Sequence, residues 1–272
     1  MKVRVVLREL WKQMEQDDVL SLAAQCAYYF LFSLFPFIIF IMSLLGYLPI
    51  AAQDVLLLIK EYIPEGAAAG IDYHLNNVLE TKRGGALSFG LIIALVTASA
   101  AMNSIVLAVN KAYGLPPRKS FIQSRILAIA LTAGMLMVVA SALLLSVFGQ
   151  LIGDWMYAHL HLPWNQIQLW NVLRWVINFV ILFLVLTAVY YIAPNTCLTC
   201  KDVLPGAIMA AVGWQLASWG FSYYVNHFGN YSATYGSLGG VIVLLSWFYI
   251  SALLIIAGGE LNALTYLFKK RT

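Results

Sequence analysis

The chain has 272 residues, of which 62% are hydrophobic and only 10% are charged, and its net charge is +4. Water-soluble domains carry about 25% charged residues, so this composition excludes an ordinary soluble domain and indicates an integral membrane protein with a single membrane domain. The small basic excess does not predict binding to nucleic acid, and we expect membrane lipids as the partners.

The first 18 residues predict an amphipathic helix on the cytoplasmic side. Six apolar residues between positions 3 and 14 follow helical spacing, and basic residues such as Arg8 and Lys12 stand between them. Such a helix lies either along the inner membrane surface or against the cytoplasmic ends of the bundle. No cleavable signal peptide is expected, because the apolar run after Asp18 is 35 residues long.

The first membrane span is predicted at residues 23–48 and contains a proline. Pro36 removes a backbone donor and clashes with the preceding turn, so we expect a kink near Ser33 to Pro36. Residues 49–85 then form a long outer loop, in which Val55–Tyr62 and Ile71–Leu79 are predicted as short surface helices.

Five further spans are predicted at 86–109, 126–150, 172–193, 203–226 and 237–265, because each region is apolar over the roughly 20 residues that cross a bilayer. The last two form a hairpin, since residues 203–259 contain no Asp, Glu, Lys or Arg and are interrupted by the turn-forming segment GNYSATYG at 229–236. The predicted fold is therefore an all-α polytopic membrane protein with six transmembrane helices.

The distribution of basic residues predicts the orientation. With both termini in the cytoplasm, twelve Lys and Arg residues face inward and four face outward, as the positive-inside rule requires. Aromatic residues in the outer loop 154–171 and near the hairpin turn fit an interfacial belt: Trp155, Tyr157, Trp164, Trp170, Tyr223, Tyr224, Tyr231 and Tyr235.

Two predicted helices carry stripes of small residues, which permit close helix packing in lipid. One stripe comprises Ala94, Thr97, Ala101, Ser104 and Ala108, and the other Ala210, Gly213, Ala217 and Gly220. We expect these helices to be central to the bundle. The same stripes leave open the alternative that they line a substrate path.

Four segments together resemble the YihY/BrkB family of bacterial membrane proteins, and the resemblance covers nearly the whole chain. They are AAQCAYYFLFSLFP at 23–36, NKAYG at 110–114, YGSLGG at 235–240 and GGELNA at 258–263. The resemblance implies a six-span inner-membrane protein, with an envelope role as a looser suggestion, since members are linked to envelope integrity, serum resistance or lipid export. It provides no catalytic residues, and the family's older ribonuclease BN label is regarded as mistaken.

Polar residues inside apolar helices are the candidate functional residues. Glu260 is predicted near the inner interface, where it either has a structural role, by snorkelling or by bonding to a neighbouring helix, or takes part in coupling or gating. Arg174 is predicted at the outer start of the fourth span, where snorkelling is the alternative to anion binding. The amides either form interhelical hydrogen bonds or line a polar cavity: Asn103, Asn110, Asn178, Gln215 and Asn262.

No cofactor, metal site or catalytic site is predicted. Cys197 and Cys200 form a lone CxxC without the second ligand pair of a zinc site, and His159 and His161 lack metal-binding neighbours. Walker, HExxH and GxSxG motifs are absent from the sequence.

Two functional hypotheses follow, neither of them enzymatic. The protein either moves a lipid or another amphiphile, or is a structural scaffold for envelope integrity. A ribonuclease is disfavoured because the predicted cytoplasmic loops are too short to build a basic groove. A homo-oligomer and partners among envelope proteins are left open.

Overall fold

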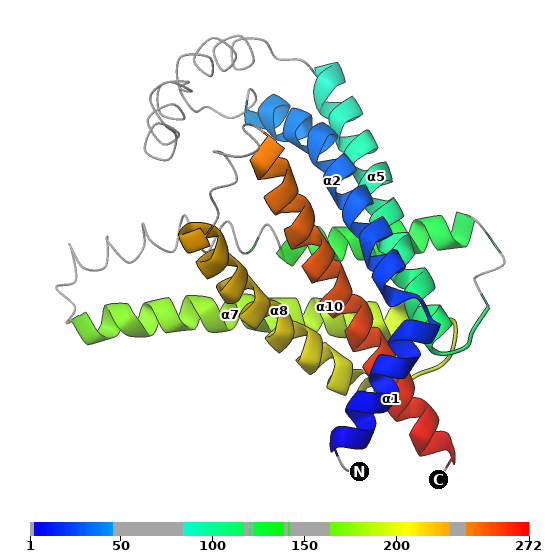
Figure 1. Ribbon diagram of the computed structural model, residues 1–272. Coiled ribbons are helices and arrows are strands. Elements are labelled where there is room, and N and C mark those ends of the chain that lie inside the picture. Colours follow the sequence, from blue (N-terminus) through cyan, green and yellow to red (C-terminus); the bar gives the residue numbers. More distant parts are fainter. Residues whose placement is uncertain are drawn as a thin grey trace. The chain divides into compact units, whose positions relative to one another are not determined.

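The computed structural model describes residues 3–45, 84–116, 120, 122–138, 141, 164–228 and 238–271. Every regular element in these residues is an α-helix, so the predicted all-α class is confirmed for them (Figure 1). The chain divides into two compact units, Met1–Tyr29 with Ser99–Thr272, and Phe30–Ala98. Residues 49–83 of the predicted outer loop, with both of its expected short helices, lie outside the described residues, as do His159 and His161.

Four helices contain a stretch long and apolar enough to cross a membrane: Val19–Ile39, Ser88–Ala112, Val172–Ile192 and Gly239–Lys270. They belong to α2 (Val19–Leu45), α5 (Gly84–Ala112), α7 (Trp164–Ile192) and α10 (Leu238–Arg271). Helix α8 (Cys200–Phe228) is also 29 residues long but is less apolar. The helix Ile122–Val138 is shorter, and residues 142–150 of the predicted third span lie outside the described residues.

Helix α2 continues through Pro36 as one α-helix and is not broken there. In the turn before the proline, the Ser33 hydroxyl donates to the Phe30 carbonyl at 2.8 Å. Pro36 has no N–H, so the carbonyl four residues earlier lacks its usual helical donor. The kink expected at this position stays a prediction.

Helix α7 begins at Trp164, eight residues before the expected start of the fourth span. Trp164 and Trp170 therefore lie in the first turns of α7, before the stretch Val172–Ile192 that is long and apolar enough to cross a membrane. Arg174 is correspondingly in the third turn of α7, where its side chain is half-buried. The predicted start at residue 172 followed the apolar stretch, whereas the helix itself tolerates polar residues in its first turns.

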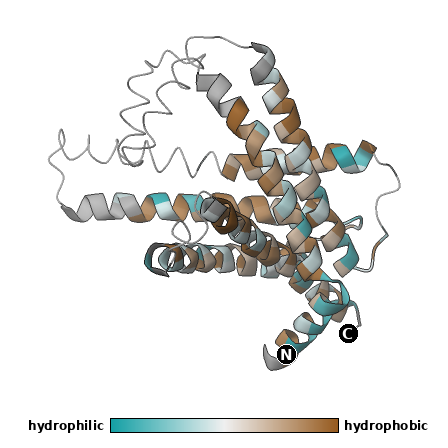
Figure 2. Ribbon diagram, turned by 45° about the horizontal axis from the view of Figure 1, so that its top comes forward, coloured by the Kyte–Doolittle hydropathy of each residue, from teal (hydrophilic) through white to brown (hydrophobic). Residues whose placement is uncertain are grey.

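Helix α10 packs against α8, α7 and α1 (Val3–Gln16). Leu10 of α1 is buried, whereas Leu7 and Trp11 are exposed, so α1 lies against the bundle and leaves part of its apolar face open. Figure 2 shows hydrophilic residues on α1, beside both termini, and apolar residues along most of the long helices. The contact between α1 and α10 therefore brings the N-terminal and C-terminal helices together.

The small-residue stripe of α5 is a packed surface, as predicted. Ala94, Ala101, Ser104 and Ala108 are buried. In α8 the stripe is buried at Ala210 and half-buried beyond it. Helix α8 does pack against both α7 and α10, in agreement with the expected central position.

Candidate functional site

The contact between α8 and α10 is made backbone to backbone. A Cβ atom at Gly206 would overlap the carbonyl oxygen of Gly258, and one at Gly258 would overlap the hydroxyl of Tyr190. Because neither residue has a side chain, the two helices approach far more closely than larger residues would allow. Gly206 and Gly258 therefore fix the position of α8 along α10.

Two hydrogen bonds tie the neighbouring helices α8 and α7 to α10. The backbone N–H of Gly206 donates to Oδ1 of Asn262 at 2.6 Å. The hydroxyl of Tyr190, from α7, donates to the Ile255 carbonyl at 2.6 Å. Both side chains are fully buried, where an unmade hydrogen bond would cost about 1–3 kcal/mol. Asn262 thus makes an interhelical bond through its oxygen, whereas its buried Nδ2 has no hydrogen-bond partner in the described part of the chain.

Asn110 joins the end of α5 to the segment that follows α7. Its Nδ2 donates to the carbonyls of Val106 and Ala193, at 2.8 and 3.1 Å, and its Oδ1 accepts from the N–H of Asn195 at 2.8 Å. The side chain is only 3% exposed and its amide is bonded at both ends. Asn110 therefore links the end of α5 to the segment after α7 through both ends of its amide.

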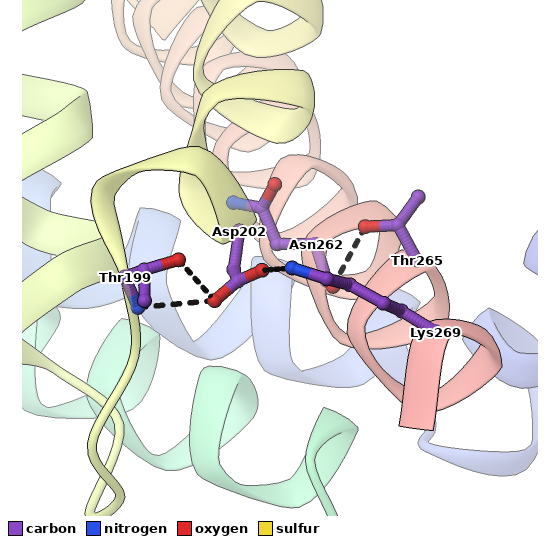
Figure 3. Close-up of polar contacts among 5 residues, drawn as sticks. All are labelled: Thr199, Asp202, Asn262, Thr265 and Lys269. Atoms are coloured by element: carbon purple, nitrogen blue, oxygen red, sulfur yellow. Dashed lines mark hydrogen bonds and ion pairs between the residues drawn. The ribbon is translucent and has the colours of Figure 1, made fainter. Parts of the chain in front are cut away.

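The start of α8 is capped and tied to the end of α10 (Figure 3). Asp202 accepts from the hydroxyl and backbone N–H of Thr199, which is a capping arrangement, and pairs with the Lys269 ammonium at 3.0 Å. The bonds from Thr199 lower the pKa of the Asp202 carboxyl from its ordinary value, and Lys269 adds to this effect. Cys197 and Cys200, beside this cap, are exposed free thiols.

Glu260 differs from Asn110, Asp202 and Asn262 because none of its side-chain oxygen atoms is bonded. Its side chain is 1% exposed, and neither carboxyl oxygen has a hydrogen-bond partner in the described part of the chain. Gly259, just before it, has room for no side chain, because a Cβ there would lie 2.9 Å from Val109 on α5. Glu260 therefore occupies a closely packed position on α10 at the level of the α5 C-terminus.

Two charged residues lie close enough for their charges to act on Glu260: Asp17, in the turn between α1 and α2, and Lys111 near the end of α5. The Lys111 ammonium donates to the backbone carbonyl of Asp17 at 2.6 Å. Burial raises the pKa of the Asp17 carboxyl, and the positive charge of Lys111 partly opposes this shift. Glu260, Asp17 and Lys111 form the candidate site, which we call the carboxyl site.

A groove of about 240 Å³ adjoins the carboxyl site at Lys111. Its other lining residues are Leu22, Leu107, Asn110 and Leu115. Apolar walls with one ammonium group suit a molecule that has an apolar part and an anionic group.

The remaining predicted residues lie elsewhere along the helices. At 1.5 Å per residue, Arg174 and Asn178 are about 24 and 18 Å before Tyr190 on α7. Gln215 is about 13 Å beyond Gly206 on α8, and Asn103 about 9 Å before Val109 on α5. Each of these four side chains is half-buried. The carboxyl site thus includes Glu260, with Asn110 beside it at the groove, but not these four.

Sequence reasoning missed Asp17, Lys111, Tyr190 and Gly206. A tyrosine in an apolar run and a glycine after Pro205 were visible signals, but their partners are set by tertiary packing. Among the described residues, no group of three or more His, Cys, Asp or Glu side chains is arranged to hold a metal ion.

Comparison with known proteins places this architecture among bacterial membrane proteins. The family model described as Virulence factor BrkB matches residues 10–271. A protein named "Putative ribonuclease-like protein YfkH" from Bacillus subtilis is 44% identical over 97% of this chain and 96% of its own length. A "UPF0761 membrane protein" from Tolumonas auensis is 26% identical over 93% of this chain and 82% of its own length.

A further "UPF0761 membrane protein" from Xanthomonas campestris pv. campestris is 25% identical over 93% of this chain, which spans 59% of that longer protein. No solved structure matches the chain. The matches and the four long apolar helices identify an integral protein of the bacterial inner membrane.

Proposed function

The chain belongs to the Virulence factor BrkB family, and we propose that it moves a lipid or another amphiphile in the bacterial inner membrane as part of an envelope-related role. The main support for this proposal is that Glu260 is buried and has no hydrogen-bond partner in the described residues. The amide of Asn110 is bonded at both ends and that of Asn262 at its oxygen, whereas Glu260 is bonded at neither carboxyl oxygen. An ionisable group that instead destabilises the bundle is expected to serve a function.

The groove beside Lys111 supports an amphiphile as the substrate. Its three leucines offer an apolar surface, and the ammonium of Lys111 offers a charge for an anionic headgroup. A lipid with a phosphate group combines these two features, and no soluble metabolite is needed to explain them. The proposed substrate class is therefore an anionic lipid.

The proposal includes six membrane spans with both termini in the cytoplasm. At 1.5 Å per residue, the 29 residues of α8 extend about 43 Å, which exceeds the roughly 30 Å apolar core of a bilayer. The contact of α1 with α10 supports a common side for both ends of the chain. The excess of basic residues in the inward segments supports the cytoplasm as that side.

A scaffold for envelope integrity is the second candidate. The tight contact at Gly206 and Gly258, with the Asp202–Lys269 ion pair at one end, favours a rigid pair of helices. A scaffold of this kind needs no substrate and no unpaired carboxyl group. Lipid movement by the purified protein therefore separates the two candidates.

The test is the movement of fluorescent lipids between leaflets of liposomes that contain the purified protein. We expect faster movement than in protein-free liposomes, with anionic lipids favoured over zwitterionic ones. Lys111→Met should remove that preference, because it removes the charge from the groove. The matched control is Lys12→Met, which removes a charge from an exposed position of α1. Unaccelerated movement of every lipid class would refute transport and leave the scaffold.

Ribonuclease activity is not part of this proposal, although one relative carries that word in its name. Protein purified free of host ribonucleases should leave RNA intact. Cleavage that copurifies with the folded protein would contradict this expectation.

A further inference from the structure

The carboxyl group of Glu260 cannot remain ionised at low cost in the packing observed. It is 1% exposed, and neither oxygen receives a hydrogen bond from the described residues. Burying a carboxylate without a partner costs far more than burying the neutral acid, because only the charged form loses a large hydration free energy. The neutral form is therefore the one compatible with this conformation.

The groups that face Glu260 from neighbouring elements do not change this balance. Lys111 of α5 supplies one positive charge and Asp17 of the α1–α2 turn supplies one negative charge. The hydroxyl of Tyr190, on α7, donates to the Ile255 carbonyl. Helix α8 packs on the Gly258 face of α10 through Gly206 and Ala210, which have no ionisable side chain.

One ammonium group thus stands near two acids and can balance only one of them. The Lys111 ammonium is bonded to the residue that carries the other acid, through the backbone carbonyl of Asp17. We propose that Glu260 is a proton-binding site, which holds a proton in the packed conformation described here and releases it when that packing opens. Proton binding does not depend on lipid movement, but its use to drive or gate lipid movement rests on the proposed function.

Release of the proton from Glu260 would act on another part of the structure, the α1–α2 turn. An ammonium has three donors, and one of those of Lys111 is engaged by Asp17. An ionised Glu260 would attract this ammonium, and with it the α1–α2 turn. Asp18 in that turn has a φ of 56°, in the left-handed region that aspartate adopts more readily than most residues other than glycine. Titration of Glu260 should therefore shift the α1–α2 turn.

A membrane-permeant carbodiimide tests the proposal on the whole protein in liposomes. A protonated carboxyl adds to the carbodiimide, its proton passes to a carbodiimide nitrogen, and the acyl group then migrates to form a stable N-acylurea. We expect mass spectrometry to locate this adduct on Glu260, with labelling that declines as the pH rises. Glu260→Gln should lose the adduct. Glu15→Gln, which replaces an exposed carboxylate on α1, should keep the adduct on Glu260.

Two charge variants make the test independent of misfolding. Removing the negative charge with Asp17→Asn should move the decline in labelling to lower pH. Removing the positive charge with Lys111→Met should move it to higher pH, since the cation no longer favours the ionised acid. General unfolding would shift both variants in the same direction and would expose Glu260 to water.

The outcomes also separate this inference from the proposed function. An absent adduct at Glu260, labelling that does not change with pH, or protection by Na⁺ at constant pH would overturn the proton site. Labelling with the expected shifts but without lipid movement would support the proton site and contradict only the transport proposal. Lipid movement without labelling of Glu260 would support the transport proposal and contradict the proton site.

Discussion

The backbone of α8 at Gly206 lies directly against the backbone of α10 at Gly258. A methyl group at Gly206 would overlap the Gly258 carbonyl oxygen and lie 2.6 Å from Nδ2 of Asn262. A carbonyl of a packed helix cannot rotate away as a flexible side chain can. This contact is therefore the least tolerant point that the structure identifies.

Gly206→Ala should be strongly destabilising, by more than the 1–3 kcal/mol that is usual for overpacking, because backbone must move. Gly220→Ala, in the same helix, is the matched control, since a Cβ there meets nothing within 4 Å. Unfolding of both variants in mixed micelles, followed by tryptophan fluorescence, measures the difference. Equal stability of the two variants would contradict the backbone contact.

Gly258 and Tyr190 should be energetically coupled. Gly258→Ala introduces a methyl group that overlaps the Tyr190 hydroxyl, and Tyr190→Phe removes that hydroxyl with its bond to Ile255. Tyr190→Phe alone should cost about 0.5–1.5 kcal/mol of stability. The double variant should lose less than the two single variants combined, because the overlap is relieved. Strict additivity in a double-mutant cycle would argue against direct contact.

Asn110→Ala should destabilise the protein by about 1–3 kcal/mol, because it leaves the Ala193 carbonyl and the Asn195 N–H without their present partner. Asn103→Ala, an amide in the same helix that is only half-buried, should cost clearly less. Thermal unfolding midpoints in one detergent allow the comparison. A larger effect at position 103 would show that the assignment of the structural amide is incorrect.

Asp202→Ala should cost about 1 kcal/mol at neutral pH through loss of the α8 cap. The folded-state pKa of Asp202 is lowered, so its stabilisation is complete above the ordinary carboxyl pKa and is lost as the pH falls through the lowered value. The stability difference between native protein and Asp202→Ala should thus disappear in acid. Lys269→Met should have a smaller effect, since the Lys269 side chain is 70% exposed. A stability difference between native protein and Asp202→Ala that grows as the pH falls would contradict this prediction.

The helices were predictable because apolar, charge-free runs are long and local. The limits of the helices were less predictable, since α7 begins eight residues before the predicted start of its span. The first turns of a helix accept polar residues such as Asn165 and Gln166, which a search for apolar runs excludes. Helix α8 is less apolar because its 29 residues include polar ones such as Lys201, Asp202 and Gln215.

The site was predictable only in part. Glu260, Asn262 and Asn110 were recognisable as polar residues within apolar helices, but nothing local distinguishes a bonded amide from an unbonded carboxyl group. That distinction depends on Gly206, Ala193 and Asn195, which are distant in sequence. Neither the snorkelling nor the interhelical bond expected of a structural Glu260 is seen, because its side chain is buried and unpartnered among the described residues.

The most direct measurement is the rate of lipid movement per folded molecule for Glu260→Gln in liposomes, relative to native protein and Glu15→Gln. If Glu260 is retained for function, Glu260→Gln should be at least as stable as native protein and should move lipids several-fold more slowly. Glu15→Gln should match native protein in both respects. Unchanged lipid movement per folded Glu260→Gln molecule would contradict the account.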